Sequence, residues 1–250
     1  MLPPLAEFDR LDQAQAARVP GQFIWSREVA RARRYLVGTC PELRAAYMAM
    51  PDRMGEEMFF AHDPVRLFYK MEDVPLTSID EFVTDLKART RKVLAELFGE
   101  EYRHCPCVEL SSSTATKQTR HLFFAARFRN LAEVHKVVEL VLPGNLYLGV
   151  NKRLYRGDRG SLCLPFLPSS AKKEPFQSAV PFEFEDALVN VVGQAAGNPL
   201  LEVPEQSRKK HKTGQGPPPK EVARSRLKPG RCSSRSTYAV GGWQLKHQNI

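Results

Sequence analysis

Cationic and hydroxyl side chains gather in the segment SSSTATKQTRH, which ends at His121 and runs directly into the apolar stretch LFFAA. Lys117, Arg120 and His121 can donate hydrogen bonds, and Ser112 and Ser113 add hydroxyl groups. Charge-assisted donors of this kind suit a bound phosphate group. The segment therefore predicts a phosphate-binding loop that leads into a buried strand, with an ordinary polar loop as the alternative.

A second segment, VRLFYKMED, lies upstream and places Lys70, Glu72 and Asp73 at the end of an apolar run. Alternate residues of a strand share a face, so Lys70 and Glu72 should lie side by side. Pairing between these two side chains would neutralise the Glu72 carboxylate. Asp73 should point to the opposite face unless a β-bulge intervenes.

Together the two segments resemble motifs of the eukaryotic DNA-directed primase-polymerase family, which belongs to the archaeo-eukaryotic primase superfamily. LFYKME resembles the family's strand ending in Asp-x-Glu, and residues 112–121 resemble its Ser-Ser-Thr…Lys…Ser-Arg-His segment. RRYLV, at residues 33–37, resembles an early strand of the family. Further matches follow in the family's order: Val150-Asn151, Leu154-Tyr155, Asp158-Arg159 and Ser169-Ser-Ala-Lys172. The resemblance covers roughly residues 23–175 and implies an RRM-like catalytic core.

The resemblance also implies roles for individual residues. Its nucleotide-binding positions are Ser112, Ser113, Lys117, Arg120 and His121. In the family, two acids of the first motif and one of a later motif hold divalent metals for nucleotidyl transfer. Here Glu72 is kept as the catalytic, metal-binding acid, while Lys70 and Asn151 stand at the other two positions. Mg²⁺ or Mn²⁺ is the implied cofactor, and nucleotides and template or primer DNA are the implied partners.

The loss of two carboxylates bears directly on this chemistry. Hard divalent cations are held by clustered anionic oxygens, and an ammonium group at a ligand position repels them. We therefore expect a protein that binds nucleotide and DNA in replication or damage tolerance, with weakened nucleotidyl transfer. Two alternatives stay open. One is an active primase-polymerase that uses a shifted acid such as Asp73, and the other is an unrelated α/β interaction domain.

The charge is distributed unevenly along the chain. Its formal net charge is +9, and the excess of Lys and Arg lies in residues 205–250, where Glu205 and Glu221 are the only acids. We predict a primase-polymerase-like α/β domain over residues 1–204. We predict a basic, disordered tail over residues 205–250, because this part has too few apolar side chains to offset the entropy cost of folding.

The tail and the cysteines suggest where the protein resides. SRKKHK, at residues 207–212, is typical of a nuclear localisation signal or a nucleic-acid contact, so we predict a nuclear protein, with the mitochondrion as the alternative. The family usually continues into a Cys/His-rich zinc region, and no such pattern follows residue 175, so we expect a shortened chain without zinc. The five cysteines follow no framework spacing, which favours reduced thiols. No apolar run reaches membrane-spanning length.

Hydrophobic periodicity predicts an α/β fold, with a mixed sheet and packed helices. A capping-box pattern at residues 78–81 and apolar residues at helical spacing predict a helix that ends at Gly99. Asn130 is expected to cap a second helix that stops at Pro143, and residues 43–50 form a shorter third. Strands are predicted at residues 35–37, 65–71, 121–127, 146–150 and 161–166. We expect one groove over the sheet to be lined by Lys70, Glu72, Lys117, Arg120, His121 and Asn151.

Overall fold

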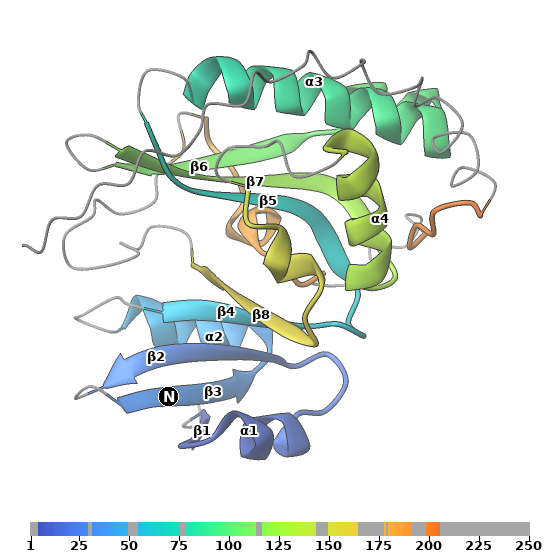
Figure 1. Cartoon of the computed structure of the whole chain (residues 1–250). Coiled ribbons are helices and arrows are strands. Elements are labelled where there is room, and N and C mark those ends of the chain that lie inside the picture. The colour runs from blue at the N-terminus through green and yellow to red at the C-terminus, as the bar shows by residue number, and fades with distance from the viewer. Residues whose placement is uncertain are drawn as a thin grey trace, which may run out of the picture. The chain divides into compact units, whose positions relative to one another are not determined.

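The described strands form two sheets (Figure 1). One has five strands in the order β1-β3-β2-β4-β8, and the other has three in the order β5-β7-β6. The structure, a computed structural model, describes residues 5–29, 32–49, 55–75, 79–113, 117–143, 150–164, 178, 180–191 and 199–205. The predicted tail therefore lies outside the described residues beyond Glu205, as do residues 169–172 and most of the strand predicted at residues 146–150.

All neighbouring strands in these two sheets pair antiparallel. The strands are β1 (Ala6–Phe8), β2 (Phe23–Val29), β3 (Ala32–Gly38), β4 (Gly55–Phe60), β5 (Val65–Pro75), β6 (Cys107–Ser113), β7 (Lys117–Phe128) and β8 (Arg159–Cys163). The α/β class is confirmed, but two antiparallel sheets replace the single mixed sheet that we expected. For the pairs β2–β3 and β6–β7 the physical reason is that the connecting segments have only a few residues, which is too short for a parallel crossover.

Four α-helices occur in the described part of the chain: α1 (Leu11–Ala17), α2 (Cys40–Met48), α3 (Ile79–Phe98) and α4 (Leu131–Val141). Three short 3₁₀ helices accompany them: η1 (Glu100–His104), η2 (Lys152–Tyr155) and η3 (Phe184–Ala187). Figure 1 shows α3 lying over the three-stranded sheet, and Tyr69 of β5 hydrogen-bonds Thr90 of α3 at 3.0 Å. None of the helices in the described ranges has the length and apolar character needed to cross a bilayer.

All three predicted helices are present, although the third spans Cys40–Met48 and so begins and ends earlier than predicted. Ser78, the first residue of the predicted capping box, lies outside the described residues. α3 buries an apolar stripe and ends at Phe98, directly before Gly99, whose φ of 118° lies in the left-handed region that glycine tolerates best. Asn130 caps α4, because its side-chain oxygen accepts a hydrogen bond from the Glu133 N–H at 3.1 Å. Thr39 and Glu42 form a capping box at the start of α2.

The chain order around the three-stranded sheet is β5–α3–β6–β7–α4. After α4 the chain returns to the sheet at Val150, which forms an isolated antiparallel bridge with Met71 of β5. β5 also pairs with β7, so Val150 lies on the edge of β5 opposite β7. This return brings the segment that begins at Asn151 next to the end of β5.

The buried carboxylate of Glu57 hydrogen-bonds residues 189–190 and holds them against the five-stranded sheet. Glu57 of β4 accepts hydrogen bonds from the Val189 and Asn190 backbone N–H groups, both at 2.8 Å, and from Asn190 Nδ2 at 2.7 Å. Burial raises the pKa of Glu57 to about 7, while these hydrogen bonds act in the opposite direction. The result is a tie between β4 and residues 189–190, which lie beside the start of β5.

Candidate functional site

Three polar side chains from two distant segments meet at the end of β5. Lys70 Nζ lies 2.8 Å from Glu72 Oε1, and Asn151 Nδ2 donates to Glu72 Oε2 at 3.2 Å. The Asn151 backbone N–H donates to the Lys70 carbonyl at 3.0 Å, beside the Met71–Val150 bridge. The predicted Lys70–Glu72 pair is confirmed, and Asn151 joins it as expected.

This cluster does not fit a divalent metal. Both carboxylate oxygens of Glu72 accept from nitrogen donors, and the ammonium of Lys70 would repel a cation. In the described part of the chain, no group of three or more His, Cys, Asp or Glu side chains is placed to hold a metal ion. Lys70 is 16% exposed and Glu72 is 44% exposed, so the cluster lies at the protein surface.

A β-bulge lies next to the cluster. The register of β5 on β7 shifts between Met71, which faces Arg120, and Val74, which faces Gln118. Three steps along β5 match two steps along β7, so β5 carries an extra residue here. A β-bulge at this place is the condition under which the Asp73 side chain could turn to the face of Glu72 and serve as a metal ligand. The Asp73 side chain lies outside the described residues, and its role stays a prediction.

His121 shares the sheet face of Lys70, but it is fully buried. The two residues are directly opposite in the pairing of β5 with β7, and paired residues point to the same side. The His121 ring lies edge-on to the Phe123 ring, with centroids 6.2 Å apart. His121 is 0% exposed and Ser112 is 2% exposed. A phosphate group cannot reach His121 in this arrangement. The implied contact stays a prediction that requires the side chain to become exposed.

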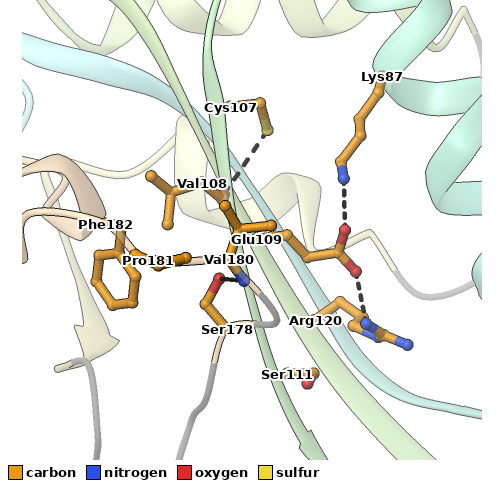
Figure 2. A pocket seen from close by; sticks show the side chains of 10 residues that line it. All are labelled: Lys87, Cys107, Val108, Glu109, Ser111, Arg120, Ser178, Val180, Pro181 and Phe182. Atoms are coloured by element: carbon orange, nitrogen blue, oxygen red, sulfur yellow. Dashed lines mark hydrogen bonds and ion pairs between the residues drawn. The ribbon is translucent and has the colours of Figure 1, made fainter.

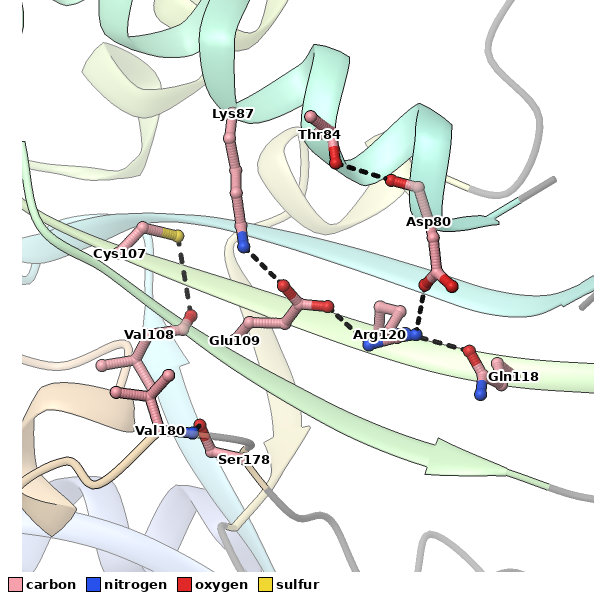
Figure 3. A network of polar contacts seen from close by, with 10 residues as sticks. All are labelled: Asp80, Thr84, Lys87, Cys107, Val108, Glu109, Gln118, Arg120, Ser178 and Val180. Carbon is pink, nitrogen blue, oxygen red and sulfur yellow. Dashed lines mark hydrogen bonds and ion pairs between the residues drawn. The ribbon is translucent and has the colours of Figure 1, made fainter.

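Arg120 lies on the opposite face of the sheet, so the prediction of one groove is wrong for this residue. Its Nη1 donates to Glu109 at 2.5 Å (Figure 2), and its Nη2 and Nε donate to Asp80 at 2.6 Å and Gln118 at 3.0 Å (Figure 3). The reason is strand alternation: Arg120 and His121 are neighbours in β7, and successive side chains point to opposite faces.

Most of the predicted hydroxyl-rich loop belongs to two paired strands, and residues 114–116 between them lie outside the described residues. The first residues of the predicted loop belong to β6 and the last belong to β7, and Ser112 pairs with Thr119. Backbone pairing between the two strands satisfies groups that a loop would leave to side chains or water. The backbone of Lys117 pairs with Pro75, but the side chains of Lys117 and Ser113 lie outside the described residues.

A basic segment that follows Asn151 in the chain was not predicted as part of the site. Arg153, Arg156 and Arg159 follow Asn151 closely, and all three side chains are exposed. Arg156 also lies 3.4 Å from Glu139 of α4, which orients it loosely at the surface. The pattern RLYRGDR was the available signal, because it has three Arg within seven residues, and clustered basic residues are typical of nucleic-acid contacts.

No protein-family model matches the sequence, and no curated protein matches it.

Proposed function

We propose that this chain is a primase-polymerase relative that binds nucleotide and template DNA and transfers nucleotides weakly. The observation that carries the proposal is the meeting of Lys70, Glu72 and Asn151. The resemblance aligns these residues with the family's three metal-binding acids, and 79 residues separate Glu72 from Asn151. Chance matches in an unrelated domain would have no reason to converge on one carboxylate.

The chain order gives a second line of support. β5–α3–β6–β7–α4 is a β-α-β-β-α succession with β7 between β5 and β6, and the isolated bridge at Val150 lies where a last strand of a β-α-β-β-α-β succession would pair. Ferredoxin-like folds show this succession, and an RRM-like core uses a four-stranded sheet. The finer assignment to a primase-like core remains part of the proposal.

Weak transfer follows from the charge of the cluster. The family's chemistry needs carboxylates to offset the charge of bound Mg²⁺ or Mn²⁺, and here one ammonium and one amide occupy two of the three positions. Nucleic-acid binding does not depend on those carboxylates. Exposed arginines contact phosphates directly, and Arg153, Arg156 and Arg159, all exposed, follow Asn151 within eight residues of the chain.

DNA binding and strand synthesis test the two halves of the proposal separately. Binding of a fluorescent template–primer duplex, followed by anisotropy, should weaken in Arg153→Glu and Arg156→Glu. The slope of log affinity against log salt should fall by about 1 for each phosphate that the variant no longer neutralises. Arg103→Glu is the matched control, because Arg103 is an exposed arginine of η1 outside this segment.

Primer extension by the unmodified protein should be slight with Mg²⁺ and, where detectable, should depend on Mn²⁺. Absence of DNA binding would favour the unrelated interaction domain. Robust extension with Mg²⁺ would favour the active enzyme, and loss of that extension in Asp73→Asn would identify the shifted acid.

A further inference from the structure

A pocket of about 210 Å³ lies at β6, the edge strand of the three-stranded sheet (Figure 2). Consecutive residues of β6 contribute to it, which places it along the edge of the strand. Its polar wall consists of Lys87, Glu109, Ser111, Arg120 and Ser178, and its apolar wall of Val108, Val180, Pro181 and Phe182. A volume of this size suits a small group and not a whole nucleotide.

The polar wall carries two cations against one carboxylate. Lys87 of α3 pairs with Glu109 Oε2, and Arg120 Nη1 donates to Glu109 Oε1 at 2.5 Å (Figure 3). Arg120 also reaches Asp80, but Asp80 is 81% exposed and does not line the pocket. The lining therefore has a net charge of +1 at neutral pH.

The cations also have donors left for a ligand. An ammonium group has three N–H donors and a guanidinium has five. The contacts of the described residues use one N–H of Lys87 and three of Arg120. The hydroxyl of Ser111 adds a further donor beside them. The remaining donors therefore allow an anion to bond to Lys87 and Arg120 while Glu109 keeps its contacts with both.

Thiol chemistry is not what this pocket provides. Cys107 also lines it, but burial raises the pKa of its thiol to about 12, so the reactive thiolate is scarce at neutral pH. The Cys107 thiol instead donates to the Val108 carbonyl at 3.7 Å. The pocket is therefore suited to binding and not to nucleophilic attack.

We propose that this pocket binds a carboxylate or phosphate group that is carried on an apolar body. The anionic oxygens bond to Lys87 and Arg120, and the apolar body packs on Val180 and Phe182. The inference is independent of the proposed function, because Lys87 and Arg120 lie on the α3 side of the sheet and the Lys70 cluster lies on the other side. A substitution that abolishes anion binding in the pocket should therefore leave the Lys70 cluster intact, and the reverse.

The test uses phenyl phosphate and phenylacetate as probes, with benzyl alcohol as the neutral control, and follows binding to the full chain by amide chemical shifts. Both anions should bind in the millimolar range or tighter, and the stronger of the two identifies the ligand chemistry. Lys87→Met should weaken binding at least about tenfold, because it removes one charge-assisted hydrogen bond. Lys92→Met is the matched control, because Lys92 is a lysine of α3 that does not line the pocket.

Glu109→Gln is the second variant and keeps the side-chain volume. It removes the one negative charge of the lining, so both anions should bind several-fold more tightly. Equal effects of Lys87→Met and Lys92→Met would overturn the proposal. So would unchanged or weaker binding in folded Glu109→Gln, or failure of both anions to bind at millimolar concentration. Chemical shifts that respond equally to benzyl alcohol would show an apolar pocket without anion selectivity and would also overturn it.

Discussion

Restoring the missing carboxylates should turn the Lys70 cluster into a metal site. In the natural chain, Glu72 accepts from Lys70 Nζ at 2.8 Å and from Asn151 Nδ2 at 3.2 Å. The double variant Lys70→Asp, Asn151→Asp removes both donors and places three carboxylates together. Without metal, these three charges repel one another, and the protein loses stability.

The size of that loss follows from the exposure of the cluster. Two unit charges 4 Å apart interact by about 1 kcal/mol in water and by about 4 kcal/mol at an effective dielectric of 20. Glu72 is 44% exposed, so the value in water is the better guide. Three repelling pairs and the missing ion pair should lower the free energy of unfolding by roughly 3–4 kcal/mol.

Thermal unfolding with Mn²⁺ or with a chelator measures the gain of a metal site. At a hundred times the dissociation constant, a ligand that binds the native state alone adds about 2.7 kcal/mol. For a chain of this size that corresponds to a rise in Tm of about 5–10 °C in the double variant. The unmodified protein and Lys92→Asp should show no comparable rise.

Two results would refute this reasoning. A Tm of the unmodified protein that rises with Mn²⁺ as much as that of the double variant would mean that another acid completes a metal site. A double variant that is destabilised but gains nothing from Mn²⁺ would mean that the three positions do not converge on a cation. In the same double variant, primer extension should rise if the proposed function is right.

Three further outcomes are expected. Because the folded pKa of Glu57 is raised to about 7 from 4.5, its contribution to stability is fully present below pH 4.5 and is lost as pH rises through 7. Relative to Glu57→Gln, the unmodified protein should therefore gain up to about 3 kcal/mol between pH 7 and 4.5 in urea unfolding. Thr90→Val leaves the buried hydroxyl of Tyr69 without its acceptor and should cost about 1–3 kcal/mol, more than Tyr69→Phe at about 1 kcal/mol. Phe68→Ala empties a fully buried site and should cost about 3–5 kcal/mol in the same assay.

Local patterns in the sequence predicted the elements around the site. The helical stripe that ends at Gly99, the Asn130 cap and the apolar runs of β5 and β7 are all found in the structure. These features depend on neighbours within a few residues, and helix or strand geometry fixes how such neighbours meet. The pairing of Lys70 with Glu72 could be predicted for the same reason, because their spacing along one strand decides it.

Several other elements carry weaker signals in the sequence. Sequence patterns do not predict β1, β2, β4, β6 or α1, and they favour a loop where the paired strands β6 and β7 lie. β6 contains the hydroxyl run at Ser111–Ser113, which is typical of loops when it stands alone. Its strand conformation depends on pairing with β7, and side-chain alternation along β7 places Arg120 on the α3 face.

The sequence by itself determined the residue types at the cluster and thus its shortage of carboxylates. Only the tertiary structure decided that Asn151 reaches Glu72, that His121 is buried, and that Glu57 is closed off from water beneath residues 189–190. These outcomes depend on contacts between segments far apart in the chain. The exposure of a side chain depends on the residues that pack over it, and the local sequence does not identify those residues.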